Sequence, residues 1–187
     1  MLSSRLGHFF DKPFTFLAKK TGISPNTLTV IGFIITVIAA IELPRDLFLG
    51  GLLIILGALF DVFDGVVART NNKTSTFGAF LDSVLDRYSD AVLFCGFAWY
   101  FLEKGSVTGA GISIATMTGA LLISYTRARA EGLGGKCHTG LMERPERIIL
   151  MALAALTGFV MEIMWVMLVL THITVLQRIL YVRGQLK

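Results

Sequence analysis

Residues 61–86 read DVFDGVVARTNNKTSTFGAFLDSVLD and place four aspartates inside two of the most apolar segments of the chain. Asp61 and Asp64 are three residues apart, and Asp82 and Asp86 are four apart, so each pair lies on one face of a helix. A carboxylate in hydrocarbon is costly, so four of them need a shared partner. Hard oxygen ligands in this number favour two divalent cations, Mg²⁺ or Mn²⁺.

The composition indicates a membrane protein. Of the 187 residues, 54% are hydrophobic and only 16% are charged, and the mean hydropathy is +0.70. This is too apolar for an ordinary soluble domain. Because no linker, repeat or second domain is visible, we predict a single all-α integral membrane domain over residues 1–187.

Turn signals divide the apolar sequence into about six segments that are long enough to span a bilayer. The predicted transmembrane bundle covers 26–182, and the last two spans are separated near Glu162. Before it, aromatic and basic residues alternate over 1–22, which predicts an amphipathic helix in the membrane interface. The six predicted spans are 26–43, 47–68, 77–102, 107–130, 145–161 and 162–182.

The distribution of basic residues predicts the orientation. The connections LPRD (43–46) and EKGS (103–106) are short and carry one basic residue each, whereas the other side receives most of the lysines and arginines. The positive-inside tendency therefore places both termini and all four aspartates at the cytoplasmic face of the cell membrane.

Residues near the aspartates suit a phosphate-containing ligand. Gly65 and Ala68 leave room for close approach, and Arg69 ends the segment with a guanidinium suited to phosphate oxygens. The loop TNNKTST (70–76) adds hydroxyls and backbone donors just before the next helix begins, which is a favourable place for an anion.

A second group of basic residues lies at three other predicted helix ends on the same side. As a set, these arginines form a candidate anion pocket for an acceptor that itself carries phosphate. They are Arg127, Arg129, Arg144, Arg147 and Arg178.

The stretch 61–86 resembles the signature of the CDP-alcohol phosphotransferases, D-x-x-D-G-x-x-A-R, eight residues, then G-x-x-x-D-x-x-x-D, with every fixed position met. The resemblance implies six transmembrane helices, a homodimer, and attack of an alcohol on the lipid phosphate of a CDP-activated lipid with release of CMP. It implies that Asp61, Asp64, Asp82 and Asp86 bind the two cations and that Asp86 is also the general base. The implied contacts to the CDP-lipid are Asn26, Thr27, Leu28, Thr29, Gly65, Ala68, Arg69 and Ser75.

Other segments, SYTRARAE, ERPERI and LQR, resemble the phosphatidylinositol phosphate synthase branch of that family, which the archaetidylinositol phosphate synthases share. The branch implies that Arg127, Arg144 and Arg178 hold the phosphate of inositol 1-phosphate. It leaves the donor open between CDP-diacylglycerol and CDP-archaeol, and it implies membrane lipid and no nucleic acid as partner. The loop GLGGKCHTGLM (132–142) departs from the branch, and glycerol 3-phosphate, the acceptor of phosphatidylglycerol phosphate synthases, is the alternative.

Two hypotheses of other classes stay open from the residues. An intramembrane prenyltransferase also uses aspartate-bound Mg²⁺, although the chain lacks an N-D-x-x-D motif. A divalent-cation channel or transporter is the non-enzymatic alternative, and it is disfavoured because the acids gather at one membrane face.

Overall fold

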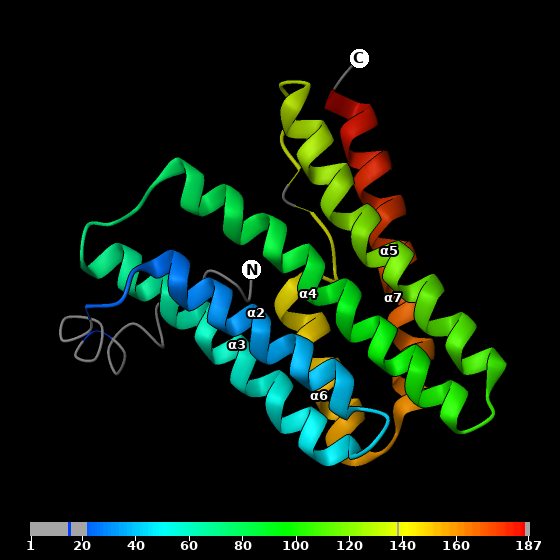
Figure 1. Cartoon of the computed structure of the whole chain (residues 1–187). Helices are drawn as coiled ribbons and strands as arrows, with labels where there is room; N and C mark the ends of the chain where they lie inside the picture. The colour runs from blue at the N-terminus through cyan, green and yellow to red at the C-terminus, as the bar shows by residue number, and fades with distance from the viewer. Residues whose placement is uncertain (1–14, 16–21, 138, 186–187) are drawn as a thin grey trace.

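The computed structural model describes residue 15, residues 22–137 and residues 139–185, and every element in these ranges is helical (Figure 1). Most of the predicted interfacial helix over 1–22 lies outside the described residues. The helices are α2 (Pro25–Glu42), α3 (Leu47–Thr70), α4 (Thr76–Glu103), α5 (Val107–Gly132), α6 (Arg144–Thr157) and α7 (Val160–Gln185).

Short polar side chains begin four of these helices. Ser24, Asp46, Ser75 and Ser106 each accept a hydrogen bond from the backbone N–H three residues ahead, at the starts of α2, α3, α4 and α5. These bonds satisfy one of the amides that a helix start leaves without an intrahelical partner. The predicted connections LPRD and EKGS therefore end at capping residues, Asp46 and Ser106.

The boundary between the last two helices differs from the prediction. Gly158 adopts a left-handed conformation with φ 79° and ends α6, and α7 begins at Val160. Glu162 lies in the first turn of α7 and does not separate the spans. Glycine stops a helix here because it reaches positive φ without the steric cost that a Cβ atom brings.

Four helices, α2, α3, α5 and α7, are long and apolar enough to cross a membrane. Helix α4 has 28 residues, but Asp82, Asp86, Arg87 and Asp90 interrupt its first half, and α6 has only 14 residues. The described part of the chain is thus the helical bundle of a membrane protein.

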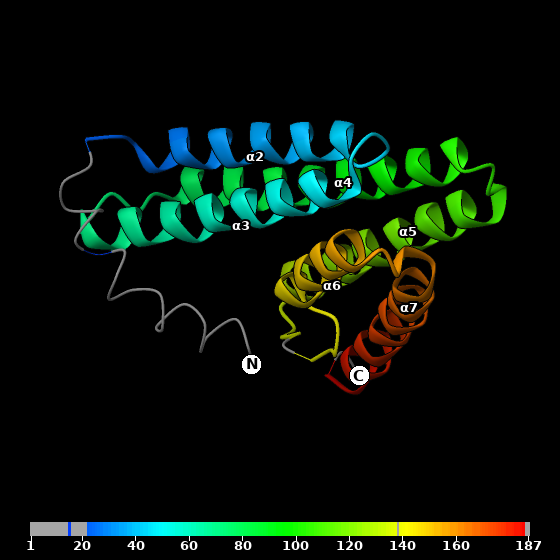
Figure 2. The same ribbon diagram turned by 90° about the horizontal axis from the view of Figure 1, so that it is seen from below.

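The helices pack both against neighbours in the chain and against helices further along it. Helix α2 contacts α3 and α4, α4 contacts α5, α5 contacts α7, and α6 contacts both α3 and α7 (Figures 1 and 2). Phe94 and Phe97 of α4 are fully buried in the main core. Gly96 allows α2 to approach, because a Cβ atom there would lie 2.6 Å from the carbonyl oxygen of Ala40.

The helices alternate in direction, which gathers the polar residues. The connections α2–α3, α4–α5 and α6–α7 lie together at one end of the bundle, at the lower right of Figure 1. The end of α3 and the starts of α4 and α6 lie away from that end. The aspartates and Arg144 are carried by these other ends, and Arg127 and Arg178 lie toward the ends of α5 and α7.

Candidate active site

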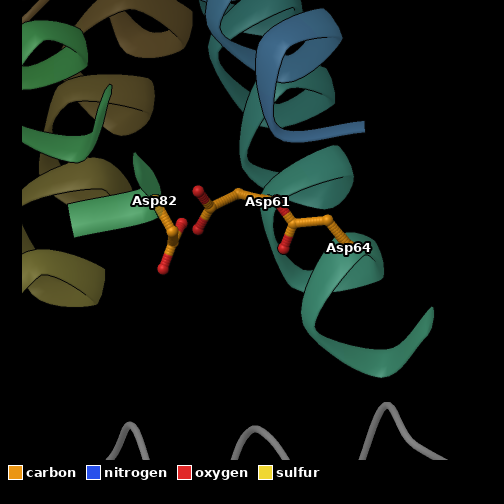
Figure 3. A group of neighbouring side chains, drawn as sticks. All are labelled: Asp61, Asp64 and Asp82. Carbon is orange, nitrogen blue, oxygen red and sulfur yellow. The ribbon is translucent and has the colours of Figure 1, made fainter. Parts of the chain in front are cut away.

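Three of the four signature aspartates form one cluster. One carboxylate oxygen from each of Asp61, Asp64 and Asp82 lies within 4.8 Å of the others, and Figure 3 shows the three groups turned toward a shared space. Asp61 and Asp64 come from the last turns of α3, and Asp82 comes from the second turn of α4. The i, i+3 spacing on α3 thus gives the convergence that the sequence predicts.

The cluster fits a hard divalent cation. Asp64 is 6% exposed, and its Oδ2 atom is buried without a hydrogen-bond partner. A buried carboxylate oxygen with no donor is costly unless a cation satisfies it. Three carboxylates with mutually close oxygens are the type of ligand set that Mg²⁺ and Mn²⁺ prefer.

Asp86 lies beside this cluster and contacts an arginine. Its Oδ1 atom is 2.9 Å from Nη1 of Arg144, and the same nitrogen donates to Oδ2 of Asp61 at 2.6 Å. Asp86 follows Asp82 by one helical turn, which carries it toward the start of α6. The structure therefore groups three aspartates, and the predicted roles of Asp86 as fourth ligand and general base stay predictions.

A cavity of about 180 Å³ lies on one side of the cluster, between the start of α2, the end of α3 and the start of α4. Asp64 and Asp82 line it. At its wall a Cβ atom on Gly78 would lie 2.9 Å from Oγ of Ser75, so glycine keeps this corner open. Six residues predicted to contact the CDP-lipid also line it: Asn26, Thr29, Gly65, Ala68, Arg69 and Ser75.

The other two predicted CDP contacts lie away from that cavity. Leu28 is 2% exposed and packs in a small apolar cluster with Val66 and Val67. The hydroxyl of Thr27 lies 2.7 Å from that of Ser24 at the exposed start of α2. Helical periodicity turns both side chains away from the wall that Asn26 and Thr29 share, and their predicted contact with the nucleotide stays a prediction.

A second cavity, of about 190 Å³, lies on the other side of Asp86. Arg127 from α5, Arg144 from α6 and Arg178 from α7 all line it, so the structure brings the three predicted acceptor arginines together. Arg129 does not line it. Of the four signature aspartates, Asp86 lines this cavity together with the three arginines.

The three arginines differ in their burial and in the hydrogen bonds that they make within the protein. Arg178 is 3% exposed and donates its Nε to the carbonyl oxygen of Thr139 at 2.9 Å and its Nη1 to that of Ile123. Arg127 is half exposed and donates to Glu131, 3.0 Å away on the next turn. Arg178 thus fixes the segment before α6, whereas Arg127 lies at the more open side.

Sequence reasoning missed an ion pair in this cavity wall. Asp90 forms an ion pair with Arg147, 2.5 Å between Oδ2 and Nη2, and both side chains are 3% exposed. The sequence indicates Arg147 only as one of five arginines in the candidate anion pocket. The signal was available, because Asp90 continues the four-residue spacing of Asp82 and Asp86 on the same helix face.

Comparisons with known proteins agree with this geometry. The sequence profile of the family described as CDP-alcohol phosphatidyltransferase matches residues 22–177. The chain is 39% identical to the archaetidylinositol phosphate synthase of Pyrococcus horikoshii, over 89% of this chain and 87% of the relative. It is 37% identical to the phosphatidylinositol phosphate synthase of Mycobacteroides abscessus, over 88% and 79% of the two chains.

Solved structures of a related enzyme have the same fold. The phosphatidylinositol phosphate synthase of Mycobacterium tuberculosis with CDP-DAG bound is 30% identical, with a TM-score of 0.84 over 92% of this chain and 93% of that one. Its complex with manganese and citrate superposes with a TM-score of 0.82 over 92% and 88% of the chains.

The family resemblance and the transferase activity predicted from the signature are thereby confirmed, and the prenyltransferase and cation-transporter hypotheses are set aside. The predicted divalent-metal cofactor is confirmed by the acidic cluster together with the family match, while the number of ions stays a prediction. This chain belongs to the CDP-alcohol phosphatidyltransferase family of membrane enzymes.

Proposed function

We propose that the chain transfers the phosphatidyl or archaetidyl group of a CDP-activated lipid to inositol 1-phosphate and releases CMP. The observation that carries the proposal is the arrangement of two cavities on either side of linked carboxylates. One is lined by the signature residues, the other by three arginines, and Arg144 joins Asp61 to Asp86 between them. The names of the relatives support inositol phosphate as the acceptor.

The cavity beside Asp64 and Asp82 suits the CDP group. Gly65 and Ala68 let a nucleotide lie close to the backbone of α3, and Arg69 supplies a guanidinium for phosphate oxygens. Ser75 lies at the start of α4, where the backbone amides of the first helical turn favour a bound phosphate. The lipid tails then remain in the membrane while the nucleotide enters from the aqueous side.

The cavity beside Asp86 suits a phosphorylated alcohol. Arg127, Arg144 and Arg178 surround it from three helices, so a phosphate dianion is held by charge-assisted hydrogen bonds from several directions. Free inositol lacks the group that these side chains recognise. This difference makes the phosphate of the acceptor the main determinant of binding.

The acidic cluster is the place for the metal ions. A divalent cation would be held by Asp61, Asp64 and Asp82. Asp86 would be a further ligand, for the second of two ions. Mg²⁺ or Mn²⁺ bound there would neutralise charge on the pyrophosphate.

We assign the Asp86 carboxylate as the general base that accepts the proton of the acceptor hydroxyl. The acceptor oxygen forms a bond to the lipid-side phosphorus, the bond from that phosphorus to the CMP oxygen breaks, and the proton passes to the Asp86 carboxylate. Nη1 of Arg144 forms an ion pair with this carboxylate at 2.9 Å, and both residues line the acceptor cavity.

The finer membrane arrangement is part of the proposal. We infer that α4 and α6 also span the bilayer, that residues 1–22 lie in its interface, and that both termini and the site are cytoplasmic. The alternation of helix direction supports six spans, since the helix ends that carry the aspartates and the acceptor arginines then lie on one side of the membrane. We also propose a homodimer, as the family resemblance implies.

The direct test is CMP release by the purified protein with CDP-diacylglycerol and Mg²⁺, using inositol 1-phosphate, free inositol or glycerol 3-phosphate as acceptor. The proposal predicts turnover with inositol 1-phosphate and a product of phosphatidylinositol phosphate mass. Turnover with glycerol 3-phosphate alone contradicts the assigned acceptor and makes the chain a phosphatidylglycerol phosphate synthase. CDP-archaeol in place of CDP-diacylglycerol then resolves the donor.

A further inference from the structure

Two ion pairs join α4 to α6 on successive helical turns. The outer pair, Asp86 with Arg144, lies at the site, with side chains 16% and 24% exposed. The inner pair, Asp90 with Arg147, lies one turn further along both helices and is almost wholly buried, at 3% for each side chain. The second pair therefore repeats the geometry of the first at the buried side of the acceptor cavity, which Asp90 and Arg147 both line.

Arg147 also holds the backbone that leads into α6. Its Nη1 donates to the carbonyl oxygen of Met142 at 3.2 Å, and the N–H of Met142 donates to the hydroxyl of Thr174 in α7 at 3.1 Å. One buried guanidinium thus ties α4 to the segment that precedes Arg144. The position of that segment determines where the Arg144 side chain begins.

Arg147 lines the acceptor cavity, but its guanidinium is already bonded within the protein. The residue is 2% exposed, and both of its terminal nitrogens already have partners. Simple stabilisation is also a weak explanation, because two buried charges pay a large desolvation cost and a well-packed apolar pair does as well. Unlike an ion pair, an apolar pair does not supply a directional hydrogen bond that fixes the position of α6 along α4.

We propose that Asp90 and Arg147 are positioning residues. They set the position of the start of α6 along α4. This position places the Arg144 guanidinium between Asp61, Asp86 and the acceptor cavity. The inference rests on the proposed function, since it assigns Arg144 to the acceptor side. It requires that loss of the inner pair affects the acceptor and leaves the CDP-lipid cavity intact, because residues of α2, α3 and the start of α4 build the latter.

The test uses steady-state CMP release by the full-length protein in liposomes. In Asp90→Asn we expect KM for inositol 1-phosphate to rise about tenfold or more, because small displacements of a binding group have large effects, with KM for CDP-diacylglycerol within about twofold. Glu42→Gln is the matched control. It breaks the exposed pair between Glu42 and Arg45, 3.0 Å apart at the opposite end of the bundle, and is expected to leave both constants unchanged.

A second variant separates positioning from folding. In Asp90→Leu with Arg147→Met both charges are removed and an apolar contact replaces them, so a purely stabilising pair predicts recovery of wild-type kinetics. The positioning role predicts a raised acceptor KM in this variant at an unchanged melting temperature. The inference is overturned if either variant has both the melting temperature and the KM for inositol 1-phosphate of the wild type. Failure of the proposed function is distinct, because the unaltered protein then shows no turnover with inositol 1-phosphate.

Discussion

At the scale of single residues, Arg144 links the two halves of the site. Its Nη1 contacts Asp61 from α3 and Asp86 from α4, and its side chain also lines the acceptor cavity. Asp61 therefore faces both an arginine and the two other aspartates of the cluster. A divalent cation held by the cluster and the Arg144 guanidinium compete for the same carboxylate.

This competition gives a prediction about cation affinity. In Arg144→Gln the affinity for Mn²⁺ is expected to rise about tenfold, equivalent to about 1.4 kcal/mol, because a positive charge beside Asp61 is lost. Mn²⁺ titration followed by electron paramagnetic resonance, with CMP release measured in parallel, checks this. Weaker Mn²⁺ binding in the variant would show that Arg144 organises the cluster and does not compete with the cation.

Asp86 gives the second prediction at this scale. In Asp86→Asn we expect CMP release to fall about a thousandfold, in the range typical of a lost general base, while much of the CDP-diacylglycerol binding remains. Asp46→Asn is the matched control, because Asp46 caps α3 at the opposite end and asparagine caps a helix equally well. Full turnover of Asp86→Asn is incompatible with its assignment as the base.

At the scale of the elements, close approach of helices depends on a few glycines. Gly96 in α4 faces the backbone of Ala40 in α2, and Gly119 in α5 faces Thr171 in α7. Such contacts are typical of helices that associate in a membrane, where small residues let backbones approach. They hold α4 in the position from which Asp82 and Asp86 reach the site.

Substituting Gly96 tests this packing. A Cβ atom in Gly96→Ala would lie 2.6 Å from the Ala40 carbonyl oxygen, so we expect a loss of about 1 to 3 kcal/mol from the free energy of unfolding. The measurement is thermal unfolding of the protein in detergent. Gly111→Ala in α5 is the control, since nothing lies within 4 Å of its Cβ atom, and it is expected to be neutral or stabilising. Equal melting temperatures for the two variants would contradict the close contact.

The elements were largely predictable because their signals are local. Apolar runs gave all six helices, and the capping residues Ser24, Asp46, Ser75 and Ser106 fix the starts of four of them. The stop at Gly158 was missed because its neighbours are as apolar as the helices it separates. The pair of Asp90 and Arg147 and the turning away of Leu28 were also missed, since both depend on how one helix faces another.

At the scale of the whole molecule, the alternating helices bring two cavities together. Residues from α2, α3 and α4 line one, and residues from α4, α5, α6 and α7 line the other. Helix α4 is the element common to both, with Asp82 on one cavity and Asp86 on the other. The signature made the first cavity predictable by residue, whereas the second depended on three arginines far apart in the sequence.

The central claim is that one cavity holds the donor and the other holds the acceptor. The most direct measurement is KM for both substrates in two variants, Arg69→Gln and Arg127→Gln, by CMP release with CDP-diacylglycerol and inositol 1-phosphate. We predict that Arg69→Gln raises only KM for CDP-diacylglycerol and Arg127→Gln only KM for inositol 1-phosphate, each by about tenfold, as expected for a lost charged hydrogen bond. If both variants raise the KM of the same substrate, the division between donor and acceptor cavities is wrong.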